Sequence, residues 1–327
     1  MSACYRHAAA IATLAACSGL LPALEAAAQT YPARAVRLII PQSAGSATDT
    51  VARMIGTRLA EKFGQPVVHE NRVGAGGIIG VELMAKAAPD GYTIAIVSAT
   101  HAVNPSLRRN LPYDSIADFA PVTMATAQPY VMLAHPSLPA KNVRELVSLA
   151  RSRPGQINYA SSGAGTLGHL GFELLKTTAS VNMVHVPYKG IVPAITDIVG
   201  GHVSLLYSTV VSGMPQVNAG KLRALAVSSI KRAQVAPGVP TVAESGFPGY
   251  DVSGWYGILA PAKTPPDIVN RLNSEIVNIL RSPAAAERLA MDGSEAVGNT
   301  PEQFAAHIKS EIAKWGKVVK AAGITVD

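Results

Sequence analysis

The stretch PQSAGSATDT, Pro41–Thr50, places hydroxyl side chains and a glycine where an apolar run gives way to an amphipathic segment. VRLII precedes it and VARMIGTRLAEKF follows, so the pattern predicts a turn between a strand and a helix. The first backbone N–H groups of a helix have no partner inside the helix, and such termini bind anions. The turn is therefore a candidate site for a phosphate or a carboxylate.

Two kinds of residue in this turn suit an anion. Gly45 allows close backbone approach, and Ser46 and Thr48 add hydroxyl donors at the start of the helix. Asp49 has two alternatives: it caps the helix together with Ser46, or it lies in the site, where its carboxylate would repel an anion. The candidate ligand-binding residues of the turn are Ser43, Ala44, Gly45, Ser46, Thr48 and Asp49.

Further candidates follow later apolar runs. Ser98, Thr100 and His101 come after YTIAIVS, with His101 either a ligand donor or an interior histidine. A second strand–turn–helix pattern follows INYA, and two such turns facing each other would clamp both ends of a dicarboxylate. Its alternative is a turn needed only for chain reversal, and its candidate residues are Ser161, Ser162, Gly163, Gly165 and Thr166. Tyr188 and Lys189 follow MVHVP, and Lys189 either pairs with a ligand carboxylate or is a solvated surface charge.

The N-terminus has the layout of a secretory signal peptide over residues 1–28, which predicts a mature chain beginning near Gln29 in the periplasm. Leu14–Cys17 also matches a bacterial lipobox, and the alternative is a lipid anchor at Cys17. Both cysteines lie in this leader, so the mature chain is expected to have no disulfide and no thiolate metal ligand.

The formal charge is +7, and it stays +7 when the leader's Arg6 and Glu25 are removed. A basic surface favours anionic ligands, but no Lys/Arg-rich run is interleaved with aromatic residues, which argues against nucleic-acid binding. No mature transmembrane helix is expected.

The elements that position these turns alternate between strand and helix. We expect strands at 36–40, 66–69, 92–98, 131–137, 157–160, 183–188, 203–208 and 222–229, and helices at 51–63, 78–88, 143–151, 167–178, 194–201, 265–281 and 301–322. This alternation predicts an α/β fold with parallel sheets, in which ligands lie beyond the carboxyl ends of the strands.

The motifs resemble, as a set, the Bug or TctC-like solute-binding proteins of tripartite tricarboxylate transporters. The fragments are YPARAVRLIIPQSAGSATDTVAR, NRVGAGGIIG, PDGYTI, ATHAVNPSL, YASSGAGTLGHL, HVPYKG, GKLRALAV, VPTVAESGFPGY, WYGILAPAKTP and AKWGKVVKAAGI. They occur in the family's order and spacing from Tyr31 to Asp327.

The resemblance implies the two-lobed periplasmic binding protein fold (type II, Venus-flytrap). It implies one lobe from residues 29–128 plus 254–327, a second from 129–253, and a ligand cleft between them that closes by a hinge motion. It implies a small mono-, di- or tricarboxylic or aromatic acid as ligand, held by backbone amides, hydroxyls and water.

The resemblance also implies delivery of the ligand to the membrane permease subunits of a tripartite tricarboxylate transporter. The alternative partner is a signalling receptor, with the protein acting as a ligand-binding sensor. We expect a monomer that uses no cofactor or metal, binds no nucleic acid and is not an enzyme.

Three positions depart from the family. Ser46 stands where relatives usually have a second glycine, which adds a donor. Ser204 and Ser208 stand where many relatives have acids, and we expect Ser208 to lie at a strand end near the cleft, which would disfavour ligands with an ammonium group.

Enzyme alternatives have weaker motifs. GAGGIIG, Gly74–Gly80, is a near miss to the dinucleotide fingerprint, with helix packing as its alternative. Ser228–Lys231 reads S-x-x-K, the remote alternative of an exported hydrolase, but the other motifs of those enzymes do not accompany it and no G-x-S-x-G occurs. No H-x-x-x-H spacing supports a metal site.

Overall fold

The computed structural model describes residues 31–291 and 293–324. Both sheets belong to the unit that begins at Arg34. The expected signal peptide and the Cys17 alternative fall outside the described residues. Among the described helices, none has both the length and the apolar character that a membrane crossing requires.

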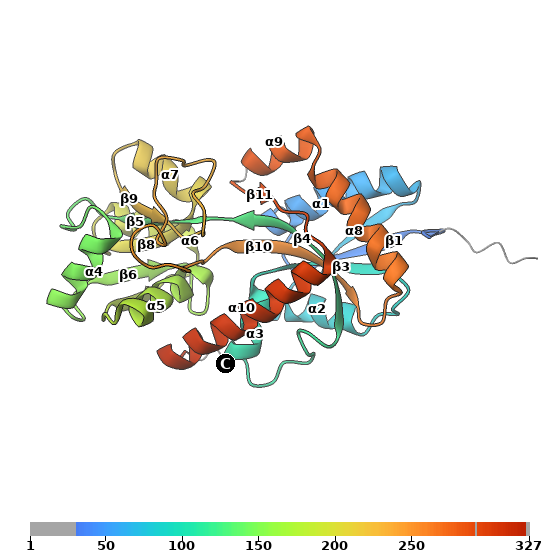
Figure 1. Cartoon of the computed structure of the whole chain (residues 1–327), viewed down its shortest axis with the longest axis horizontal. Helices are drawn as coiled ribbons and strands as arrows, with labels where there is room; N and C mark the ends of the chain where they lie inside the picture. The colour runs from blue at the N-terminus through green and yellow to red at the C-terminus, as the bar shows by residue number, and fades with distance from the viewer. Residues whose placement is uncertain (1–30, 292, 325–327) are drawn as a thin grey trace, which may run out of the picture. The chain divides into compact units, whose positions relative to one another are not determined.

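The first sheet has six strands in the order β11-β4-β10-β3-β1-β2 (Figure 1). Its strands are β1 (Val36–Ile40), β2 (Val67–Asn71), β3 (Thr93–Ser98), β4 (Phe119–Gln128), β10 (Gly254–Pro261) and β11 (Glu295–Ala296). The helices of the same part of the chain are α1 (Ala47–Phe63), α2 (Ile78–Ala85), α3 (Thr100–Leu107), α8 (Pro266–Leu280), α9 (Pro283–Met291) and α10 (Pro301–Ala322), with a 3-10 turn η1 (Ala75–Gly77) before α2.

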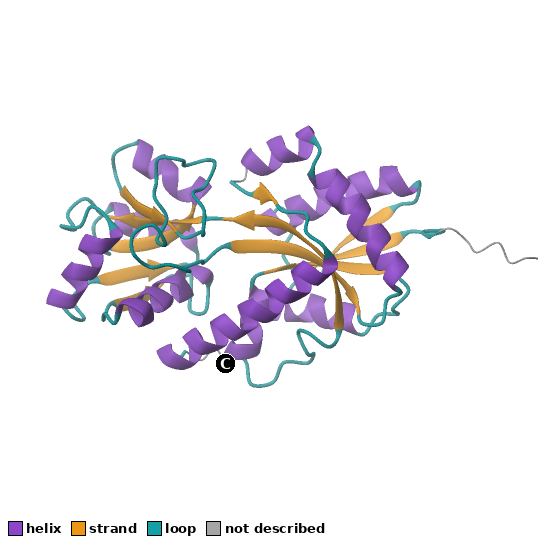
Figure 2. Cartoon of the chain, in the orientation of Figure 1, coloured by secondary structure: helices purple, strands orange, loops and turns teal. Residues whose placement is uncertain are grey.

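The second sheet has five strands in the order β7-β6-β8-β5-β9. Its strands are β5 (Tyr130–Ala134), β6 (Asn158–Ser161), β7 (Val184–Pro187), β8 (Leu205–Thr209) and β9 (Arg223–Val227). Its helices are α4 (Val143–Ser152), α5 (Leu167–Ala179), α6 (Ile191–Val199) and α7 (Val210–Asn218). Helices flank the strands of both sheets (Figure 2).

The α/β class is confirmed, but the expectation of purely parallel sheets is wrong. Strand β10 runs antiparallel to β3 and β4, and β5 runs antiparallel to β8 and β9. The physical reason is the pair of chain crossings: β4 and β5 carry the chain from the first sheet into the second across Pro129, and β9 and β10 carry it back, so the outgoing and returning strands lie antiparallel in each sheet.

Six strands and helices of the described residues were absent from the expectations, namely β4, β10, β11, α3, α7 and α9, together with the 3-10 turn η1. Strand β10, WYGILAP with its preceding glycine, has no period-two alternation because it is buried between two neighbours. Helices α3 and α7 contain Pro105 and Pro215, residues that ordinarily end a helical pattern.

Local chemistry explains where α1 begins and ends. Ser46 is its N-cap, with its side-chain oxygen accepting the Asp49 N–H at 3.2 Å, and Gly64 closes it in the left-handed conformation with φ 62°. Val51, Ile55 and Leu59 form its buried stripe, as the four-residue spacing predicted.

The two segments that cross between the sheets are joined through Ser228. Its hydroxyl donates to the Val252 carbonyl at 2.7 Å and accepts the Tyr130 N–H at 3.0 Å. Ser228 is fully buried, so the serine of the S-x-x-K motif ties the crossing segments together.

Candidate functional site

A cavity of about 620 Å³ is lined by residues of both sheets. The lining residues lie in turns that follow strands and in the two crossing segments. They are Pro41, Gln42, Ser43, Ser46 and Thr48; Val73–Gly77; Ser98–Thr100; Gln128 and Tyr130; Ser162, Thr166 and Leu167; and Gly254–Tyr256. Seven of the predicted ligand-binding residues are thus brought together: Ser43, Ser46, Thr48, Ser98, Thr100, Ser162 and Thr166.

Four helices begin at this lining. Helices α2, α3 and α5 have no side-chain hydrogen bond at their N-caps, while α1 is capped by Ser46. In the first turns of α2 and α3, the Ile78 N–H donates to the Ala75 carbonyl and the Ala102 N–H to the Ala99 carbonyl. A first-turn N–H group without such a partner carries a partial positive charge and needs an acceptor. The cavity therefore combines several donors and favourable dipoles for an anion.

The first turn is built around Asp49, which does not line the cavity. Its carboxylate accepts the Gly45 N–H, the Arg53 Nε–H and an Asn71 amide N–H, each at 2.9 Å. Burial alone would raise the pKa of Asp49, but these hydrogen bonds, led by Arg53, outweigh burial and lower the pKa to about 2. The placement favours the capping alternative, with Asp49 holding the turn in shape. The Ser46 hydroxyl, whose oxygen accepts the helix N–H, keeps its own hydrogen for a ligand.

Ala44 and Gly45 are exposed and do not line the cavity. Gly45 has φ +79°, and a Cβ there would meet no atom within 4 Å. The glycine is therefore needed for the left-handed turn and for its N–H bond to Asp49.

The Gly74–Gly77 loop is one part of the lining that the sequence analysis missed. GAGGIIG was interpreted through helix packing, which accounts for Gly80: a Cβ there would lie 2.8 Å from the Arg72 carbonyl oxygen. The preceding residues instead line the cavity and open α2. Three glycines within four residues directly before a helix were the available signal.

The third turn brings Ser98 and Thr100 into the lining, with their hydroxyl oxygens 2.8 Å apart. His101 points elsewhere, so the interior alternative describes it. Its Nε2 lies 2.9 Å from the Ser115 carbonyl, its ring stacks on Tyr113, and its burial lowers its pKa to about 4. His101 is therefore not a proposed ligand contact.

The second-sheet turn, Ser161–Thr166, presents Ser162 and Thr166 to the cavity. Thr166 Oγ1 donates to the Gly163 carbonyl at 2.8 Å. Ser161 is fully buried, and its Oγ donates to Gly163 O and accepts the Gly163 N–H. Ser161, Gly163 and Gly165 thus shape the turn from behind, outside the cavity lining.

Three predicted contacts on this side need correction. Tyr188 packs in the apolar cluster around α6 and its hydroxyl donates to Asp197 at 2.6 Å. Lys189 is exposed and is not part of the lining. Ser208 is fully buried, because its side chain lies beneath α7, where a Cβ on Gly213 would come within 3.4 Å of Ser208 Cβ. The expectation that Ser208 faces the cleft is therefore wrong.

An aromatic wall completes the cavity. Tyr130 and Tyr256 line it from the crossing segments, beside Gln128 and Trp255. The Trp255 ring packs edge-on against Phe304. Burial, with the nearby Tyr256 hydroxyl adding to it, raises the pKa of Tyr130 to about 12, so its hydroxyl stays neutral and able to donate. The signal that could have indicated this wall was WYGILAP, already recognised as a family fragment.

None of the described residues that line the cavity is Asp, Glu, Lys, Arg or His. The lining therefore offers an anion neutral donors and helix termini. Within residues 31–291 and 293–324, no group of three or more His, Cys, Asp or Glu is placed to hold a metal ion.

Solved structures of periplasmic binding proteins share this fold. An R. palustris protein with adipate is 38% identical, with a TM-score of 0.74, over 90% of this chain and 100% of its own. MatC from Rhodopseudomonas palustris with bound malate is 34% identical, with a TM-score of 0.70, over 88% of this chain and 100% of its own. The molecule is a two-lobed periplasmic solute-binding protein by fold.

The family is shown by sequence. Residues 51–324 match the family profile described as "Tripartite tricarboxylate transporter family receptor" (TctC). BugT of Bordetella pertussis is 39% identical over 300 residues, covering 90% of this chain and 91% of BugT. The chain therefore belongs to the TctC, or Bug, family of solute-binding proteins, as its motifs predicted.

Proposed function

We propose that this protein binds a small carboxylate in the cavity between its two sheets. The observation that carries the proposal is the set of three uncapped helix N-termini, of α2, α3 and α5, at a cavity whose described lining has no charged side chain. Carboxylate oxygens satisfy such N–H groups, and charge-assisted hydrogen bonds are the strong ones.

The lining favours a particular ligand class. Donors stand on both sides, with the hydroxyls of Ser46 and Thr48 from one turn and the Ser162 hydroxyl and the N-terminus of α5 from the other, so a dicarboxylate would be held at each end. Tyr130 and Tyr256 offer apolar faces to the carbon chain or to an aromatic ring. An ammonium group would have no carboxylate partner in this lining, which disfavours amino acids. Relatives crystallised with adipate and malate support this class.

The wider role follows from the family. We propose lobes of residues 29–128 plus 254–327 and of 129–253, since the first sheet draws on the former and the second on the latter. The protein would capture its ligand in the periplasm by lobe closure, without turnover, and deliver it as a monomer to a tripartite tricarboxylate permease.

Thermal unfolding in the presence of single ligands tests the binding. Adipate, malate, benzoate, citrate and glutamate are compared, and a carboxylate at a hundredfold over its dissociation constant should stabilise the protein by about 2.7 kcal/mol. Glutamate should stabilise it less than adipate.

Calorimetry on Thr166→Val then locates the ligand, with Thr178→Val, exposed on the same helix, as the matched control. Affinity lost only in Thr166→Val supports the proposal. Equal affinity in the two variants, or no carboxylate that stabilises the native protein, would reject it.

A further inference from the structure

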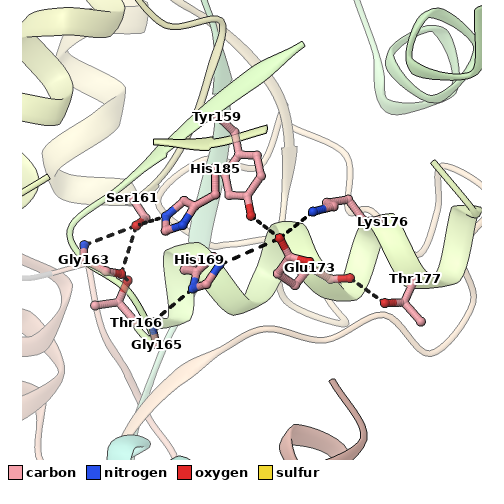
Figure 3. A network of polar contacts seen from close by, with 10 residues as sticks. All are labelled: Tyr159, Ser161, Gly163, Gly165, Thr166, His169, Glu173, Lys176, Thr177 and His185. Carbon is pink, nitrogen blue, oxygen red and sulfur yellow. Dashed lines mark hydrogen bonds and ion pairs between the residues drawn. The ribbon is translucent and has the colours of Figure 1, made fainter. Parts of the chain in front are cut away.

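Two histidines lie directly behind the Ser161–Thr166 turn (Figure 3). His169 comes from the first turn of α5 and His185 from β7, and their rings stack with centroids 3.7 Å apart and planes 8° from parallel. Each ring contacts the turn at a different point. His185 Nε2 lies 2.7 Å from Ser161 Oγ, and His169 Nδ1 lies 3.1 Å from the Gly165 nitrogen.

The bond at Gly165 fixes the protonation state of His169. A backbone N–H can only donate, so His169 Nδ1 accepts and carries no hydrogen. The neutral ring then has its proton on Nε2, which lies 3.8 Å from Glu173 Oε1. A second proton would have to go to Nδ1, where it would remove the acceptor and face the Gly165 N–H.

The groups around the two histidine rings do not favour a second proton on His169. The same Glu173 oxygen accepts the Tyr159 hydroxyl and pairs with Lys176 Nζ at 2.7 Å, so a cation already balances its charge. These three are the titratable or charged groups that face the rings from α5 and β6. Burial lowers the pKa of both histidines, that of His185 to about 4.

Other elements packed on α5 direct their polar groups elsewhere. Tyr207 of β8 and Tyr250 share a hydroxyl contact of 3.0 Å, and Tyr250 donates to the Gly171 carbonyl. From α10, Lys314 pairs with Glu311 and donates to the Asp251 carbonyl.

We propose that His169 is a positioning residue for ligand binding: its unprotonated Nδ1 holds Gly165, and with it the Ser162 hydroxyl and the N-terminus of α5, so that protonation of this ring releases the turn and weakens binding. The inference rests on the proposed carboxylate site. The stack adds to the effect, because two imidazolium rings at this separation would repel each other.

The binding test uses adipate as the probe in calorimetry at pH 8.0 and 5.0. His169→Asn keeps an amide oxygen near the Nδ1 position that does not titrate, while His169→Phe keeps a stacking ring without an acceptor. From pH 8.0 to pH 5.0, the adipate affinity of the wild type should fall by about tenfold more than that of His169→Asn. The reason is that one linked proton changes an affinity by up to about tenfold per pH unit. Protonation of adipate is common to both proteins and cancels from this ratio.

His169→Phe should bind about tenfold more weakly than wild type already at pH 8.0, with His202→Asn, an exposed histidine, as the matched control. Circular dichroism confirms folding. An affinity of His169→Asn that falls with pH as steeply as the wild type, or full affinity in His169→Phe, would overturn the proposal.

A ligand-free measurement separates this inference from the carboxylate site. In ¹⁵N-labelled protein, Nδ1 of His169 should resonate as an unprotonated nitrogen at pH 8.0, and the Gly165 amide signal should move on acidification. In His169→Asn that signal should stay in place. If the protein binds no adipate but the Gly165 signal behaves in this way, the proposed function fails and the positioning role stands. A Gly165 signal that does not respond to pH rejects the positioning role whatever adipate does.

Discussion

The two turns that face each other across the cavity have the same design and different supports. Ser43–Thr48 and Ser161–Thr166 each follow a strand, open a helix and present two or more hydroxyls to the cavity. Asp49 supports the first turn from outside the cavity lining, and its carboxylate stays ionised because its pKa is lowered to about 2. The second is held by neutral histidines. Two turns of the same design thus have different supports: the support of the first stays ionised above about pH 4, whereas the support of the second titrates.

The largest expected effect is a loss of stability when a charge is introduced at Ser208. Ser208→Asp places a carboxylate in a fully buried site beneath α7, with no cation near it among the described contacts. Denaturant unfolding should show a loss of about 3 kcal/mol or more in the free energy of unfolding. A stable variant with altered preference between adipate and glutamate would instead put Ser208 in the cavity.

Removing the support of the first turn should have the next largest effect. Asp49→Ala leaves Gly45, Arg53 and Asn71 without their acceptor, which should cost about 2 kcal/mol of stability and at least about tenfold in carboxylate affinity. Glu61→Ala on the same helix, whose pair with Arg58 is exposed, should change stability by about 0.5 kcal/mol or less. Affinity unchanged in Asp49→Ala would remove the first turn from the site.

The backbone of the second turn should be less costly to disturb. Gly163 has φ +146°, so Gly163→Val forces the turn out of its conformation and should weaken binding about tenfold, equivalent to about 1.4 kcal/mol. Gly155 has φ +73° and lies away from the cavity, so Gly155→Val is the matched control for strain alone. Calorimetry should find full affinity in the control. Equal losses in both variants would mean that strain, not ligand contact, is being measured.

The smallest effect is the pH dependence of stability. The lowered pKa values of His169 and His185 mean that the unfolded chain binds these protons first, so their contribution is present above the ordinary value of 6.5. It should be lost as the pH falls from 6.5 towards 4, whereas the contribution of Asp49, lowered from 3.8 to about 2, is lost only below about pH 4. Urea unfolding across this range should show the first loss diminished in the His169→Asn/His185→Asn variant. An equal loss in that variant would contradict the assignment.

The sequence could predict the turns but not which of their atoms face the cavity. Strand ends and helix starts follow from apolar spacing and capping residues, so Ser46, Thr48 and Thr166 were within reach. Asp49 and Ser161 have the right types at the right turns, yet their side chains bind the turn's own backbone. Whether a polar side chain faces the cavity or binds the backbone of its own turn depends on the backbone path, which residue spacing does not specify.

Contacts between segments far apart in the sequence were the other feature that the sequence could not predict. The His169–His185 stack joins α5 to β7, and the burial of Ser208 depends on α7, a helix whose Pro215 hid it from the pattern. The family resemblance supplied the fold, which is carried by whole fragments, and the class of ligand that we propose. It did not supply the orientation of single side chains.

The central claim is that carboxylate oxygens replace the missing caps of the cavity's helices. A crystal structure of the protein with the carboxylate that stabilises it most would test this directly. We predict one carboxylate within hydrogen-bond distance of first-turn N–H groups of α5, near Thr166, and the opposite end of the ligand at the N-terminus of α2 or α3. A ligand bound outside this cavity, or held in it by a charged side chain while those N–H groups bind only water, would contradict the account.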